Sequence, residues 1–160
     1  MAGSLNTSIT AWNGHGRIGM ADNAFASPNS VARTVYHEIA HNWDEQSENR
    51  FVRDFRAVAG WFQTPFGINP NGLIPGNWER AAGASWSGWW FVDKNANLDG
   101  FAWTYGKENP LEDFATSFAA YVAAATGAPH AGNTFESPAA VSSRLAQRFS
   151  VLDEFFASMS

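Results

Sequence analysis

Apolar residues recur at intervals of three or four positions in four separate stretches of the chain. This spacing places them on one face of a helix and predicts four amphipathic helices, at residues 28–45, 48–59, 110–125 and 138–157. Ser27 and Ser137 each precede a proline, a pair typical of a side-chain cap and the first helical residue. An Asn-Pro pair begins the third stretch, and glycines follow the second and third. Helices are therefore expected in the first third and the last third of the chain.

The remaining positions predict less regular structure. Residues 17–21, bounded by glycine-containing turns, predict one short strand. Residues 60–109 hold six of the eight tryptophans and show little periodicity, so we expect a long irregular segment there. Aromatic residues are densest in its later part, which contains Trp86, Trp89, Trp90, Phe91 and Trp103. We expect them mainly in the core, with a cleft for sugars or apolar side chains as the alternative.

The length of 160 residues and the hydrophobic content of 45% predict a single domain, residues 1–160, with a core of its own. The predicted class is α+β, with a small N-terminal strand region, a central helix and a mainly helical C-terminal half around the irregular aromatic segment. Sub-domains are expected at about residues 1–45 and 46–160.

Charge and composition exclude several classes of function. The net charge is −5, and no basic cluster is present, so nucleic acid is not an expected partner. No apolar run is long enough to predict a membrane span. The chain has no cysteine, which excludes disulfides, cysteine metal ligands and a cysteine nucleophile. The first residues lack the features of a signal peptide, although polar loops and few lysines favour an exported, extracytoplasmic protein.

The strongest chemical pattern lies in the first predicted helix, where residues 37–41 read His-Glu-Ile-Ala-His. His37 and His41 are one helical turn apart and project from the same face, so their imidazoles can share one metal ion. Glu38 is placed to hold a metal-bound water rather than the metal itself. The pattern H-E-x-x-H therefore predicts a zinc site.

The alternative is that both histidines are ordinary polar surface residues. The helix, however, carries an apolar stripe of Val31, Val35 and Ile39, which indicates that much of it is buried. Buried imidazoles and carboxylates need partners, and a metal ion is the simplest partner for two histidines.

A catalytic zinc ion usually takes three protein ligands and keeps a fourth position for water. No histidine follows at the expected place, so the third ligand should be a downstream carboxylate. The candidates are Glu79, Glu112 and Asp113, followed by Glu45 and Glu48, whose position on the same or the next helix is geometrically awkward. We favour Glu112, which lies in the first turn of the third helix. Acidic residues there can also simply complement the helix dipole, which leaves the choice open.

Two segments together resemble the gluzincin metallopeptidases of the lethal-factor-like and minimal kinds. The matching residues are His37, Glu38, His41, Tyr105, Asn109, Glu112, Phe114 and Ala115. The resemblance covers residues 31–44 and 101–122 and implies a zincin-like fold. It also implies that Glu112 is the third zinc ligand and that Tyr105 lies beside the metal.

The resemblance implies a zinc-dependent endopeptidase acting on a peptide or protein. Zinc would activate a water, Glu38 would take its proton, and the Tyr105 hydroxyl would stabilise the oxyanion. The strand at residues 17–21 would pair with the extended substrate. Thr116 stands where those families often carry a glutamate that supports a zinc histidine. The alternatives are therefore an inactive zinc-binding pseudoenzyme, or an aromatic-rich binding module in which the histidine pair is incidental.

The other polar segments and histidines do not predict a functional site. Residues 93–100 alternate oxygen donors like a calcium loop, but Leu98 and Thr104 stand where the EF-hand needs glycine and glutamate. We expect a turn there instead. His15 and His130 lie in loops and are expected at the surface. The sequence leaves the oligomeric state open.

Overall fold

A computed structural model describes most of the chain: residues 11–14, 16–83, 88–92, 100–127, 130–131, 135–136 and 138–158. The fold is α+β, with helices of up to 19 residues and small antiparallel sheets. None of the helices in this part of the chain is long and apolar enough to cross a membrane.

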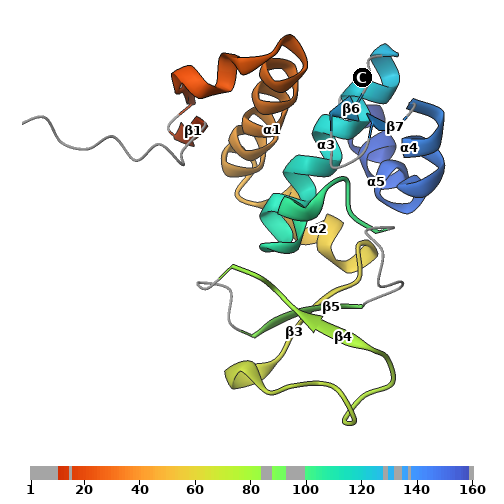
Figure 1. Cartoon of the computed structure of the whole chain (residues 1–160). Helices are drawn as coiled ribbons and strands as arrows, with labels where there is room; N and C mark the ends of the chain where they lie inside the picture. Colours follow the sequence, from red (N-terminus) through yellow and green to blue (C-terminus); the bar gives the residue numbers. More distant parts are fainter. Residues whose placement is uncertain are drawn as a thin grey trace, which may run out of the picture.

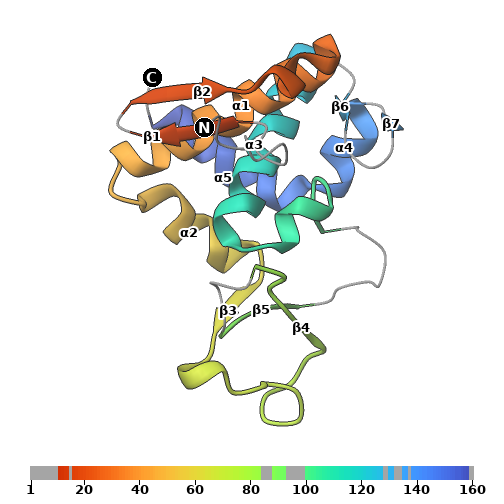
Figure 2. The same ribbon diagram turned by 60° about the vertical axis from the view of Figure 1, so that its left-hand side comes forward.

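The N-terminal part is a hairpin followed by the longest helix. Strands β1 (Ala11–Gly14) and β2 (Arg17–Met20) pair antiparallel and lie along helix α1, as Figure 2 shows. A 3-10 helix, η1 (Asp22–Ala26), leads into α1 (Pro28–Gln46). The Ser27 hydroxyl accepts a hydrogen bond from the backbone N–H of Ser30 at 3.1 Å, so this serine is the predicted N-cap. The predicted strand is β2, whereas its partner β1 was not predicted.

The middle of the chain forms a sheet, and the prediction of a long irregular segment is wrong in this respect. After α2 (Arg50–Val58) come β3 (Trp61–Gln63), the 3-10 helix η2 (Pro65–Gly67), β4 (Trp78–Arg80) and β5 (Trp89–Val92). The strands are antiparallel in the order β3-β5-β4 and lie at one end of the molecule, apart from most of the helices (Figure 1). The strands are three or four residues long, and the central strand β5 is buried on both faces. The sequence therefore showed no alternation of apolar and polar residues from which they could be predicted.

The C-terminal half contains the central helix. The 3-10 helix η4 (Thr104–Lys107) precedes α3 (Pro110–Thr126), and a two-residue pairing of β6 (His130–Ala131) with β7 (Phe135–Glu136) follows it. The predicted fourth helix is two helices, α4 (Pro138–Arg144) and α5 (Ala146–Ala157). The break falls at Leu145, which has non-helical backbone angles and is buried, so its apolar side chain concealed the interruption in the pattern. The predicted cap Ser137 and the loop residue His15 lie outside the described residues, as do residues 93–99 of the rejected calcium loop.

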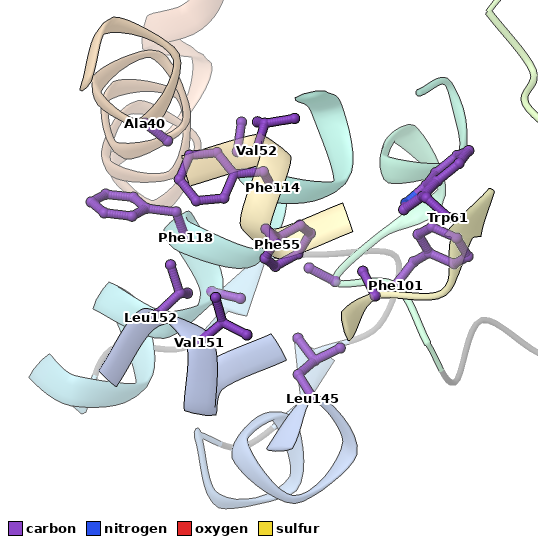
Figure 3. Close-up of a cluster of buried hydrophobic side chains, with 14 of the residues drawn as sticks. Ala40, Val52, Phe55, Trp61, Phe101, Phe114, Phe118, Leu145, Val151 and Leu152 are labelled. Atoms are coloured by element: carbon purple, nitrogen blue, oxygen red, sulfur yellow. The ribbon is translucent and has the colours of Figure 1, made fainter. Parts of the chain in front are cut away.

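The core is built around α3, which is buried on most of its surface between α1, α2 and α5 (Figure 3). Phe114 packs edge-on against Phe55 of α2, with ring centroids 5.4 Å apart. Ala115, Ala119 and Ala120 are almost fully buried, and their small side chains let neighbouring helices approach closely. Three members of the aromatic cluster are in the core as expected, since Trp89, Trp90 and Phe91 are buried. Trp103 is only half-buried, and Trp86 lies outside the described residues.

Candidate metal centre

The two histidines of α1 face each other across one helical turn. The Nε2 atoms of His37 and His41 are 3.1 Å apart, and their rings meet edge to face, with an interplanar angle of 85°. Because α1 is firmly packed against α3, this face of the helix lies between the two helices. Both imidazoles therefore present a metal-binding nitrogen to the same small space.

The carboxylate of Glu112 reaches this space from α3. Its Oε2 atom is 3.0 Å from Nε2 of His37 and 3.2 Å from Nε2 of His41. The side chain of Asn109 caps α3 and accepts hydrogen bonds from the backbone N–H groups of Leu111 and Glu112, at 2.9 and 3.0 Å. The cap fixes where the helix begins, and so places Glu112 in its first turn.

These three atoms form a nearly equilateral triangle with edges of 3.0–3.2 Å. Tetrahedral zinc, with metal–ligand bonds of about 2.0–2.1 Å, separates its ligand atoms by about 3.3 Å. The observed distances are therefore close to what one shared ion requires. Two imidazole nitrogens and one carboxylate oxygen are also a donor set suited to zinc. Together, His37, His41 and Glu112 can hold a metal ion.

The electrostatics of Glu112 suit the same role. Burial alone would raise the pKa of this carboxyl, but hydrogen bonds with His37 and His41 lower it to about 2. The side chain of Glu112 is only 17% exposed, so water screens these interactions weakly. The carboxylate is therefore ionised at neutral pH, which is the form that binds metal.

The other candidate ligands lie elsewhere. Glu79 is on β4, where both of its carboxylate oxygens accept hydrogen bonds from Nζ of Lys107 at 3.3 Å. Asp113 is turned into the protein interior and pairs with Arg148. Glu45 and Glu48 are exposed to solvent. Within the described ranges, the group able to hold a metal contains none of these four carboxylates.

Glu38 and Tyr105 border the site. Glu38 is on α1 next to His37 and is 8% exposed. Tyr105 is in η4, and its ring centroid is 5.8 Å from that of His37. Burial, followed by the negative charges of Glu112, Glu108 and Glu38, raises the pKa of Tyr105 to about 12. The phenol therefore keeps its proton at neutral pH.

Two residues beside the histidines were not assigned to the site from the sequence. Trp103 stacks on His37 with ring centroids 5.8 Å apart, and the guanidinium of Arg33 lies 4.6 Å from the Trp103 ring centroid. Arg33 precedes His37 by four positions on α1, so helical spacing alone could have placed it on the same face. No such spacing could have placed Trp103 beside His37, because the two residues are far apart in the sequence.

Thr116 does not support His37. Its hydroxyl donates to the backbone carbonyl of Asp113 at 3.1 Å, within the same helix. The Nδ1 atom of His37 is buried and has no hydrogen-bond partner in the part of the chain that the structure describes. A neutral imidazole bound to metal through Nε2 carries its proton on Nδ1, and that proton usually has an acceptor. The described residues therefore give this imidazole no acceptor of the kind that usually orients a metal-bound histidine.

Comparisons with protein-family models, curated proteins and solved structures found no match to this chain.

Proposed function

We propose that this protein is a zinc-dependent endopeptidase of the gluzincin type with a zincin-like fold. The observation that carries the proposal is the triangle of His37 Nε2, His41 Nε2 and Glu112 Oε2, with edges of 3.0–3.2 Å. Its support from the sequence is the order of the residues, since the histidines flank Glu38 in the H-E-x-x-H pattern.

His37, His41 and Glu112 would hold the zinc ion, which when bound lowers the pKa of water and polarises a carbonyl group. Glu38 then acts as the general base, accepting the proton of the attacking water and later donating it to the leaving amine. The Tyr105 hydroxyl, which is protonated at neutral pH, donates a hydrogen bond to the oxyanion that develops on the substrate carbonyl. The Tyr105 side chain is 47% exposed, so substrate can reach it.

The substrate in this proposal is an extended peptide or protein segment bound beside the hairpin. Strand β2 pairs with β1 along one edge, and the described residues supply no further strand to this two-stranded sheet. An extended peptide can add to such an edge through backbone hydrogen bonds, with pockets for its side chains giving selectivity.

Metal analysis and peptide cleavage test the proposal. We expect the purified chain to bind zinc at about one ion per molecule, and to cleave casein or a fluorogenic peptide. Glu38→Gln should abolish cleavage while zinc stays bound, because this residue moves a proton and is not a ligand. Glu112→Ala should lose zinc, whereas the matched variant Glu79→Ala should keep it. A chain that binds no zinc would refute the assignment. If Glu79→Ala lost zinc and Glu112→Ala kept it, Glu79 rather than Glu112 would be the third ligand.

A catalytically inactive zinc-binding protein is the second candidate. The buried Nδ1 of His37 favours it, because this atom has no hydrogen-bond partner among the described residues. Groups that hydrogen-bond to metal-bound histidines commonly contribute about 10–100-fold to metal affinity or activity. A wild-type chain that binds zinc stoichiometrically but cleaves no peptide would support this candidate. An aromatic-rich binding module, the third possibility, would bind no zinc.

A further inference from the structure

A buried carboxylate lies immediately next to the metal centre in the sequence but points away from it. Asp113 is 0% exposed. Its Oδ2 atom accepts hydrogen bonds from Nη2 of Arg148 and Nε1 of Trp61, both at 2.8 Å. Its Oδ1 atom accepts from Nε of Arg148 at 3.0 Å and, more weakly, from the Ser117 hydroxyl at 3.4 Å. Both oxygens are thus fully engaged, and Arg148 binds them as a two-pronged fork.

Arg148 connects this carboxylate to other parts of the fold. It comes from α5, is 8% exposed, and donates from Nη2 to the backbone carbonyl of Ala59 at 3.4 Å. Its guanidinium also lies 5.0 Å from the ring centroid of Phe101, just before η4. Asp113 therefore joins the first turn of α3 to α5, to the end of α2 and, through Trp61, to β3.

Stability alone explains this buried pair poorly. Removing two charges from water is costly, and well-packed apolar residues often stabilise a fold equally well. The distinctive feature of this pair is its position in the fold. The groups that bind Asp113 come from several elements, and all of them contact the same turn of one helix. That turn carries Glu112. Successive residues on an α-helix point about 100° apart, so a fixed Asp113 side chain sets the direction of Glu112.

We propose that Asp113, held by Arg148 and Trp61, is a positioning residue for the metal ligand Glu112. The inference depends on the metal centre proposed above. Asn109 fixes the start of α3 and the Asp113 network fixes its rotation, so the Glu112 carboxylate stands where both histidines require it. Its Oε2 atom lies 3.0 and 3.2 Å from the two Nε2 atoms. A ligand already in place loses little conformational freedom when the ion binds, and that raises metal affinity.

Zinc titration against a chromophoric chelator tests this proposal. Asp113→Asn keeps the shape and one carbonyl acceptor but removes the charge that Arg148 binds. We expect its zinc affinity to fall about 10-fold, the lower end of the range seen when a group that orients a metal ligand is removed. Its cobalt derivative should show a changed absorption spectrum, because the ligand geometry around the metal changes. Trp61→Phe removes one hydrogen bond and should give a smaller loss of the same kind, and it serves as the variant if Asp113→Asn does not fold.

The control is Leu152→Ala, another buried residue of α5 but one without a polar partner in this network. It should lower the melting temperature while leaving the zinc affinity of the folded protein unchanged. If Leu152→Ala lost as much zinc affinity as Asp113→Asn, the loss would reflect lower stability in general, and the proposal would be overturned. Unchanged affinity and cobalt spectrum in both Asp113→Asn and Trp61→Phe would overturn it as well. A wild-type chain that binds no zinc would instead refute the metal centre itself.

Discussion

Tyr105 has the structural properties of an oxyanion donor. Its phenol keeps its proton at neutral pH, and its ring centroid is 5.8 Å from that of His37. We expect Tyr105→Phe to lower kcat by about 100- to 1,000-fold, the usual effect of removing one such donor. Zinc affinity should stay within a few-fold, because the phenol is not one of the ligands. Steady-state kinetics and zinc titration on the same preparation measure both quantities. A variant with unchanged kcat and raised KM would assign Tyr105 to substrate binding instead.

Phe66 carries local strain at the surface. Its backbone is left-handed, with φ at 53°, and its side chain is fully exposed at 103%. An L residue other than asparagine or glycine adopts this conformation at a cost of about 1–2 kcal/mol. We expect Phe66→Asn to raise the free energy of unfolding by about 0.5–1 kcal/mol, because asparagine tolerates the conformation and no buried contact is lost. Urea denaturation measures the change.

Phe62→Asn is the matched control for this prediction. Phe62 is in strand β3, and its ring packs against Trp78 with centroids 5.5 Å apart. The same substitution there should lower stability, because it removes an aromatic contact and introduces a poor strand former. Destabilisation by Phe66→Asn as well would mean that the Phe66 ring is needed for the fold.

At the residue scale, the sequence predicted best what local spacing controls. His37 and His41 belong to one helix, so their juxtaposition followed from four-residue spacing. Glu112 was preferred over its rivals, but spacing could not decide, because its approach to the histidines depends on the packing of α1 on α3. Thr116 replaces the glutamate that often supports a zinc histidine in the resembling families, and its hydroxyl donates to the carbonyl of Asp113. Short-range hydrogen bonds within a helix compete for such hydroxyls.

The side chain of Asn109 caps the N-terminus of α3. Its oxygen accepts two backbone hydrogen bonds, from Leu111 and Glu112, and the residue is 8% exposed. We expect Asn109→Ala to lower the free energy of unfolding by about 1–2 kcal/mol, because two partly buried N–H groups lose their acceptor. Asn109→Asp keeps an acceptor at a helix N-terminus and should change stability much less. Chemical denaturation of the three proteins compares them, and equal losses in the two variants would contradict the capping role.

Helices α3 and α5 are joined at the surface by a bond that depends on pH. The Tyr121 hydroxyl donates to Oδ1 of Asp153 at 2.6 Å. This hydrogen bond, with a smaller effect of burial, raises the pKa of Tyr121 to about 12. The phenol of an unfolded chain titrates near pH 10, so the bond contributes fully below about pH 10 and is lost as pH rises towards 12.

The measurement is the difference in free energy of unfolding between wild type and Tyr121→Phe. We expect the wild type to be the more stable at about pH 8, and this difference to shrink by about pH 11, as the phenol of the unfolded chain ionises. A difference that stays constant between these two conditions would show that the hydroxyl contributes nothing through Asp153.

At the element scale, the helices could be predicted because their apolar faces repeat and their ends carry caps. The predicted third helix, residues 110–125, differs from α3 (Pro110–Thr126) by one residue. The sheet could not be predicted, because β5 reads Trp-Trp-Phe-Val and is buried along almost its whole length. Such a strand shows no period of two. Its neighbours β3 and β4 are stabilised by pairing with β5, and their own sequences show no strand pattern.

The proposed ion would join two parts of the molecule that the sequence keeps far apart. His41 and Glu112 are 71 positions apart, and α1 and α3 meet mainly through apolar packing. A ligand that binds only the folded state stabilises it in proportion to the logarithm of its concentration. Because both helices contribute ligands, the metal should stabilise the whole fold rather than one helix.

We therefore expect zinc to raise the melting temperature of chelator-treated protein. At a free zinc concentration about 100-fold above Kd, the gain in free energy of unfolding should be about 2.7 kcal/mol. For a chain of this size that corresponds to a shift of about 5–10 °C. Differential scanning calorimetry at several zinc concentrations measures it. Glu112→Gln should show a much smaller shift, since the ion would then bridge only residues of α1. An equal shift in Glu112→Gln and wild type would mean that zinc binds elsewhere, because an ion that joins α1 to α3 needs a ligand on α3.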